Sequence, residues 1–123
     1  MKVTPDDCIA KLAEGEQLSE AVRAVLDPPS IGSIHFFHMK FGGATELHYH
    51  EYDEYWLFTE GRTKLTLRTP EGVKREFDAG PYTLIATPKG VEHGHLPETD
   101  VKGVEWIGPL APGVRMAHLI REL

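Results

Sequence analysis

The residues most able to do chemistry are three histidines and a glutamate: His48, His50, Glu54 and His93. Neutral imidazole nitrogens and a carboxylate oxygen are ligands that suit Fe(II), Mn(II), Ni(II), Cu(II) or Zn(II). Because the set includes no cysteine thiolate, a purely structural zinc site is not favoured. These residue types therefore predict a site for one divalent transition-metal ion per chain, provided that the fold brings them together.

The first three of these residues stand on a strand, a short connection and a second strand. Residues 45–50 are predicted to be extended, and side chains alternate faces along a strand, so His48 and His50 share one face. The three residues that follow are long enough to reverse the chain. Glu54 then opens a strand over 54–59, on the same side as the two histidines. The pattern predicts that all three side chains point to one place.

The spacing of this segment resembles the first motif of the cupin superfamily. Gly42, five residues, His48-x-His50, three residues, Glu54, six residues and Gly61 follow that motif without a gap. The chain as a whole looks like a small single-domain protein of the cupin type-2 conserved-barrel kind. The resemblance implies an all-β, cupin-type jelly-roll β-barrel with a short N-terminal helical segment.

The second motif of the superfamily is matched at its centre. Pro88-x-Gly90, two residues and His93 have the expected spacing, and the resemblance makes His93 the fourth metal ligand. Gly80 lies two residues too far upstream, and Pro97 stands where an asparagine is usual. These departures affect the bend before the next strand and one polar contact of the motif.

The resemblance implies a metal-dependent enzyme that acts on a small organic molecule, with dioxygenase-like oxidoreductase chemistry the most common outcome. Four protein ligands on an octahedral ion leave two positions for a substrate, dioxygen or water. The superfamily also contains isomerases, lyases and non-catalytic proteins, so the fold is a poor guide to the reaction. Two alternatives therefore stay open: a metal-dependent isomerase or lyase of a sugar or small acid, and a non-catalytic small-ligand-binding cupin.

The other histidines are candidates for roles beside the metal. His95 lies two residues beyond His93 and faces the same way on a regular strand, so it is the candidate catalytic acid or base. A water-bonded histidine at the barrel mouth is the alternative for this residue. His35 and His38 occupy opposite faces of one strand, so at most one points inward. These two and His118 are more simply structural, although each is also a candidate for the pocket lining.

Four apolar residues are candidates for the wall of a substrate pocket, namely Trp56, Phe58, Phe37 and Met39. Trp56 and Phe58 follow Glu54 on its face of the strand, and ligand sites often lie in the mouths of barrels. Burial in the core is the simpler interpretation of all four. Charged residues around the two motifs are predicted to lie at the surface: Glu51, Asp53, Glu60 and Glu92.

Composition and charge argue against several other classes of protein. The chain has 123 residues, of which 41% are hydrophobic and 26% are charged, as expected for one soluble globular domain. It contains no apolar run long enough to cross a membrane. A net charge of −6 without a basic stripe argues against nucleic acid as a partner. The lone Cys8 excludes an internal disulfide, and the first residues lack a signal peptide, which predicts a cytoplasmic protein.

The chain is expected to begin with a helical front and to continue with strands. Residues 1–30 are predicted to form an N-terminal helical arm and residues 31–123 the barrel, in a single domain overall. Thr4 caps a helix that Gly15 ends. Residues 19–26 form either a second short helix or an arm that pairs with a partner chain.

Short runs rich in β-branched and aromatic residues follow the arm. The apolar strand that contains residues 34–39 offers an edge for pairing, so a homodimer is expected beside the small-molecule partner. Strands are predicted over 33–41, 45–50, 54–59, 63–69, 73–77, 82–86, 92–96, 101–107 and 113–120.

Overall fold

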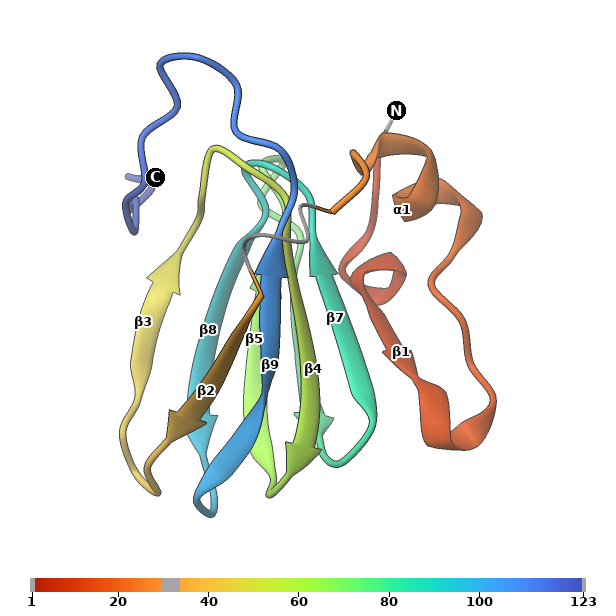
Figure 1. Ribbon diagram of the computed structural model, residues 1–123, viewed down its shortest axis with the longest axis vertical. Helices are drawn as coiled ribbons and strands as arrows, with labels where there is room; N and C mark the ends of the chain where they lie inside the picture. The colour runs from red at the N-terminus through yellow and green to blue at the C-terminus, as the bar shows by residue number, and fades with distance from the viewer. Residues whose placement is uncertain (1, 30–33, 123) are drawn as a thin grey trace.

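The computed structural model describes residues 2–29 and 34–122, and within them nine strands form two antiparallel sheets (Figure 1). The sheet orders are β1-β7-β4-β9-β2 and β3-β8-β5-β6, so the chain crosses repeatedly from one sheet to the other. This is a jelly-roll arrangement, and the predicted all-β fold is confirmed. The strands are β1 (Ile9–Lys11), β2 (His35–Met39), β3 (Thr45–His48), β4 (Glu54–Glu60), β5 (Thr63–Arg68), β6 (Lys74–Ala79), β7 (Thr83–Thr87), β8 (Glu92–Pro97) and β9 (Val101–Ile107).

The strands predicted from 33–41 to 101–107 are confirmed, with ends that shift by one or two residues. Position 33 itself lies outside the described residues. The turn at Gly61 needs a residue without a Cβ, as expected, because its φ is 87° and a Cβ there would overlap the carbonyl oxygen of Asp100.

Apolar side chains from both sheets meet between them and form the core. Phe58 of β4 faces Leu65 and Leu67 of β5, and all three are fully buried together with Val101. Burying an apolar side chain of this size contributes about 1.5–3 kcal/mol. This cluster therefore holds the two sheets together and fixes the direction of β4, the strand that begins with Glu54.

The first part of the arm is not the continuous helix that was expected between Thr4 and Gly15. Thr4 does act as a cap, but only of a short 3-10 helix, η1 (Pro5–Cys8), after which β1 pairs with β7. A second 3-10 helix, η2 (Leu12–Glu14), ends at Gly15. Short helices are marginal on their own, so the backbone partners offered by the edge of β7 outweigh the weak helical pattern.

The second part of the arm is helical, and α1 (Glu20–Val25) confirms that alternative for residues 19–26. The side chain of Ser19 accepts a hydrogen bond from the Val22 amide at 3.2 Å, and Val22 is fully buried in the core cluster. None of the helices in the described part of the chain has the length and apolar character needed to cross a membrane. The expected boundary between residues 30 and 31 lies outside the described residues.

The last predicted strand, over 113–120, is wrong. After β9 the described chain is irregular, and within it the only ladder contact is a single bridge between Tyr49 and Leu119. Pro112 lacks an amide hydrogen and Gly113 has a φ of 81°, so this stretch does not continue as a strand. The segment instead passes over one end of the barrel and comes down beside the end of β3 (Figure 1).

Candidate metal centre

The four predicted ligands lie at one end of the barrel, between the sheets. His48 ends β3 and His50 follows it, Glu54 begins β4, and His93 lies near the start of β8; these strand ends meet at the upper end of the view in Figure 1. His48 and His93 are directly opposite each other across β3 and β8. All four residues are buried, with between 1% and 6% of their surface exposed.

The donor atoms of three of the four residues, His50, Glu54 and His93, fit a single coordination sphere. Glu54 Oε1 lies 3.4 Å from His50 Nε2 and 3.2 Å from His93 Nε2. The ring centroids of His48 and His93 are 4.4 Å apart. Metal–ligand bonds of about 2.1 Å place neighbouring donors of an octahedral ion roughly 3 Å apart. The donors of His50, Glu54 and His93 are therefore spaced as ligands of a common ion, and the ring of His48 lies next to that of His93.

Backbone carbonyls determine which nitrogen of two histidines faces the site. His48 Nδ1 donates to the carbonyl of Glu46 at 2.7 Å, and His50 Nδ1 donates to the carbonyl of Ala117 at 3.0 Å. A carbonyl oxygen only accepts, so Nδ1 carries the proton in both neutral rings and Nε2 keeps a free lone pair. Metal-bound histidines are oriented by this kind of contact.

His93 is buried without a hydrogen-bond partner. Its side chain is 1% exposed, and neither ring nitrogen has a partner among the described residues, since its approach to Glu54 lacks hydrogen-bond geometry. Burial lowers the pKa of His93 well below its usual value, and the neighbouring histidines lower it further. An unsatisfied buried polar group costs about 1–3 kcal/mol. A divalent ion on the lone pair of this neutral ring would offset that cost, so the residues present fit a metal.

The other two imidazoles are perturbed in opposite directions. Burial lowers the pKa of His48. Burial is also the largest single influence on His50 and acts to lower its pKa, but the contact with the Glu54 carboxylate and the carbonyl of Ala117 together raise it. Glu54 thus brings negative charge into a buried group of imidazoles, which favours a cation at this point.

His95, the candidate acid or base, points into the barrel beyond His93. Its ring lies 4.9 Å from that of Trp56 and 5.6 Å from that of His93, and it is 4% exposed. Burial lowers the pKa of His95 to about 4, and its ring nitrogens have no hydrogen-bond partner among the described residues. The side chain is therefore a neutral imidazole with both nitrogens available to a ligand between the sheets.

The four apolar candidates surround the same interior. Trp56 Nε1 donates to Glu54 Oε1 at 2.7 Å. The ring of Phe37 lies 4.8 Å from that of Trp56 and 5.6 Å from that of Phe58. Phe58 is fully buried, whereas Phe37, Met39 and Trp56 are partly buried and pack against the core. Trp56 orients the carboxylate of Glu54, and the role of all four as a pocket wall stays a prediction.

Two residues near the site were not anticipated. The ring of Tyr52 stacks on that of His50, with centroids 4.8 Å apart, and burial raises the pKa of its hydroxyl to about 12. Glu105 of β9 is half-buried, and burial followed by the charge of Glu54 raises its pKa. Strand alternation puts Glu105 on the face of Gly103, which is buried. An acidic residue on an inward face was the signal that could have identified it.

Of the remaining histidines, one lies beside the site and two lie outside it. His118 lies against the site, with its ring 4.5 Å from that of His48 and 5.1 Å from that of His50. His35 and His38 are exposed on β2, and His38 Nε2 lies 3.8 Å from a carboxylate oxygen of Asp100. The structure thus brings His118 to the cluster and leaves the other two outside it.

Glu92 is buried, and the prediction that it lies at the surface is wrong. It points away from His93, as expected, but Arg68 covers it with two hydrogen bonds of 2.8 and 2.7 Å, and Arg121 adds a third at 3.1 Å. Long arginine side chains can cover an outward-facing carboxylate, which strand alternation does not reveal.

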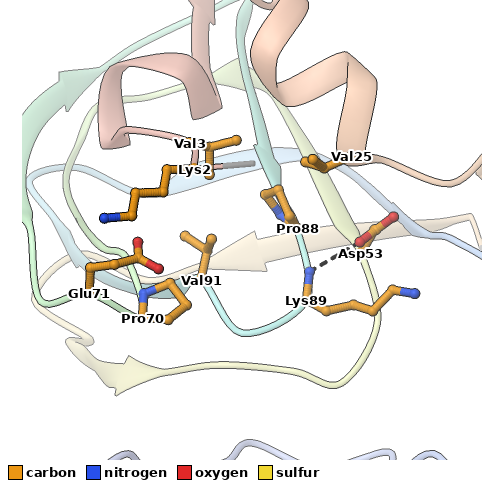
Figure 2. A pocket seen from close by; sticks show the side chains of 9 residues that line it. All are labelled: Lys2, Val3, Val25, Asp53, Pro70, Glu71, Pro88, Lys89 and Val91. Atoms are coloured by element: carbon orange, nitrogen blue, oxygen red, sulfur yellow. Dashed lines mark hydrogen bonds between the residues drawn. The ribbon is translucent and has the colours of Figure 1, made fainter.

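Asp53 is also buried, with 1% of its surface exposed, whereas Glu60 is exposed as predicted. The carboxylate of Asp53 accepts hydrogen bonds from the amides of Asp27 at 2.7 Å and Lys89 at 3.1 Å. Figure 2 shows Asp53 at the wall of a hollow of about 200 Å³ between the arm and the barrel. These contacts fix the connection that leads into Glu54.

No family model matches the chain, and no curated protein matches it. Solved structures match in fold. Oxalate decarboxylase from Lactobacillus farciminis, solved as a formate complex, aligns over 63% of this chain with a TM-score of 0.54 and 19% identity. A variant of the Bacillus subtilis oxalate decarboxylase aligns over 67% with a TM-score of 0.56 and 21% identity. Vicilin from Solanum melongena aligns over 67% with a TM-score of 0.58 and 14% identity.

This chain spans 25%, 23% and 24% of the lengths of these three proteins, respectively. The matches, together with the two-sheet topology, show that the chain shares the jelly-roll fold of these proteins, which is the fold that the resemblance to the cupin superfamily implied. At such low identity they establish the fold alone, and the reaction has to be argued from the site.

Proposed function

We propose that this cupin-fold chain binds one divalent transition-metal ion through His48, His50, Glu54 and His93. The observation that carries the proposal is the position of Glu54 Oε1, which lies within 3.4 Å of the Nε2 atoms of both His50 and His93. The buried and unpartnered ring of His93 supports it. Iron, manganese, nickel, copper and zinc all suit these ligands. The Mn(II) centres of Bacillus subtilis oxalate decarboxylase favour manganese among them.

The chain then acts as a metal-dependent enzyme on a small organic molecule held between the sheets. A bound ion supplies Lewis acidity and, where it is redox-active, oxygen chemistry. Trp56 holds the carboxylate of Glu54 in place, and Phe37, Phe58 and Met39 exclude water from the interior. His95 offers a neutral imidazole to the bound molecule, either to accept a proton or to donate a hydrogen bond.

Dioxygenase-like oxidoreductase chemistry is the first candidate reaction, because four protein ligands leave room at an octahedral ion for both a substrate atom and dioxygen. A metal-dependent lyase or isomerase of a small acid or sugar is the second. The buried, unpartnered His95 favours it, because this reaction needs a group that transfers a proton. A non-catalytic binding protein is the third, for which the different anionic ligands of vicilin are a precedent.

We also propose that the chain is a cytoplasmic homodimer. β2 ends its sheet, and it carries the exposed Phe36, with Ile34 just before it. An apolar edge strand is a natural surface for pairing. Light scattering should give a dimer mass for the wild type and a monomer mass for Phe36→Asp; a wild-type monomer would remove this part of the proposal.

The reaction class is tested by offering metal-loaded protein a panel of small carboxylic acids, oxalate included, and of sugars. Oxygen uptake and product formation are followed together, with His50→Ala as the metal-site variant and His38→Ala as the matched control on an exposed histidine. Uptake of oxygen selects the first reaction class. Turnover without oxygen that is lost in His95→Gln, while the metal is retained, selects the second. Binding without turnover selects the third, and a response that His50→Ala keeps in full would overturn a metal-based function.

A further inference from the structure

Residues 108–122, here called the C-terminal strap, cross the end of the barrel that holds the candidate metal centre (Figure 1). A hollow of about 380 Å³ opens beside His50, and Pro112, Gly113 and Val114 of the strap form one of its walls. This hollow therefore lets solvent approach His50 along the strap.

The strap is fixed to the barrel by contacts on both sides of residue 118. Tyr49 and Leu119 exchange two backbone hydrogen bonds of 2.9 and 3.0 Å. Arg121 donates to the buried Glu92 at 3.1 Å, and its guanidinium lies 4.5 Å from the centroid of the Tyr49 ring. Upstream, the carbonyl of Ala117 accepts the hydrogen bond from His50 Nδ1 at 3.0 Å. The position of residue 118 is thus set by its two chain neighbours.

These contacts hold His118 over the two histidines of the first motif. One ligand atom each from His48, His50 and His118 lie within 4.8 Å of one another. The same is true of His50, Glu54 and His93. The two groups of three share His50, and His118 is the one exposed member of either group.

The shared residue decides how many ions the two groups bind. His50 Nδ1 is occupied by the carbonyl of Ala117, so Nε2 is the one nitrogen that His50 has left for a metal. A single lone pair binds a single ion. If both groups of three bind metal, they therefore share one ion, and the exposed His118 approaches it from the solvent side.

We propose that His118 is a fifth protein ligand of the metal site, delivered by the C-terminal strap, so that metal binding and closure of the strap stabilise each other. This inference rests on the proposed metal site and extends it. An octahedral ion with five protein ligands keeps one open position instead of two. A small molecule that needs two positions has to displace His118, which the exposure of this side chain permits.

The first test measures metal affinity. Chelator-treated wild-type protein, His118→Ala and Met116→Ala are titrated calorimetrically with Mn(II) and Zn(II). Met116 is an exposed strap residue two positions away, so its variant controls for a general change in the strap. We expect His118→Ala to bind the metal about 10- to 100-fold more weakly, because loss of a residue that only orients a metal ligand already has an effect of this size. Met116→Ala should bind the metal as tightly as the wild type.

The second test measures closure of the strap with trypsin. Arg115 and Arg121 lie in the strap, so cleavage after them reports whether it is held. We expect metal to slow this cleavage in the wild type and in Met116→Ala but not in His118→Ala. Equal affinity and equal protection in His118→Ala would overturn the proposal.

The two tests separate this inference from the metal site itself. If the wild type binds one ion, His50→Ala loses it and His118→Ala keeps it with unchanged affinity, the inference fails and the four-ligand site stands. If the wild type binds no ion, the proposed metal site itself is refuted, and the inference that rests on it is refuted with it. A second equivalent of metal that His118→Ala alone removes would show two separate ions and would overturn the shared-ion argument.

Discussion

Replacing His93 with leucine should make the metal-free protein more stable and abolish its response to metal. The imidazole of His93 is 1% exposed and has no hydrogen-bond partner at either nitrogen among the described residues. In the absence of a metal, burial of its polar atoms therefore lowers the stability of the folded protein. Leucine has a similar volume and no polar atoms, and it faces the buried Leu67 across β5 and β8.

The size of the effect follows from these contacts. Each unsatisfied buried nitrogen lowers the stability by about 1–3 kcal/mol. Imperfect packing of the leucine reduces the gain from removing them by up to about 1.5 kcal/mol. We therefore expect the metal-free variant to gain about 2 kcal/mol. With a denaturant slope of about 2 kcal/mol/M, the urea midpoint rises by about 1 M.

The assay is urea unfolding of wild type, His93→Leu and His38→Leu, each with chelator and then with metal. Metal at about 100 times its dissociation constant should stabilise the wild type by about 2.7 kcal/mol and leave His93→Leu unchanged. His38→Leu replaces an exposed histidine and should behave as the wild type in both conditions. A metal-free His93→Leu that is less stable than the wild type by more than 1 kcal/mol, or one that still responds to metal, would refute the reasoning.

Three further predictions concern the surroundings of the site. Glu92→Ala leaves two arginines around a vacated carboxylate position and should lower the free energy of unfolding by about 3–5 kcal/mol in urea, whereas Glu60→Ala at an exposed ion pair should change it by less than about 1 kcal/mol. As the pH falls from 6.5 to about 4, His95 takes up a proton in the unfolded chain and stays largely neutral in the folded protein, so this residue alone should lower the stability of the metal-free protein by about 3 kcal/mol. His93 and His48, whose pKa values are also lowered, add to this loss, and unfolding at several pH values should show a flatter profile in His95→Gln. Burial raises the pKa of Cys8 to about 12, so a thiol reagent at pH 8 should label the protein in urea and not in buffer, and rapid labelling of the folded protein would contradict that burial.

The candidate site could be predicted because its residues depend on local geometry. Strand alternation puts His48 and His50 on one face, and a three-residue connection returns Glu54 to the same place. The assignment of His93 as a ligand required the second motif, because spacing alone does not say which later strand pairs with β3. The relation between Glu54 and Trp56 follows from the same period of two.

The errors arise where contacts between distant segments decide the structure. β1 forms because residues 9–11 meet the edge of β7, and nothing within the arm indicates that edge. The burial of Glu92 depends on Arg121, which is far along the chain and arrives with the strap. Residues 113–120 were predicted as a strand from their composition, yet Tyr49 and Leu119 form a single bridge. These are effects of tertiary contacts, which a local sequence pattern does not reveal.

The central claim is that His48, His50, Glu54 and His93 hold one metal ion, and elemental analysis tests it most directly. Tag-free protein purified without chelator is compared with a His50→Ala, His93→Ala double variant and with His38→Ala. We expect about one equivalent of iron, manganese, nickel, copper or zinc in the wild type and in His38→Ala, and almost none in the double variant. No metal in the wild type after each ion has been offered, or equal metal in the double variant, would contradict the claim.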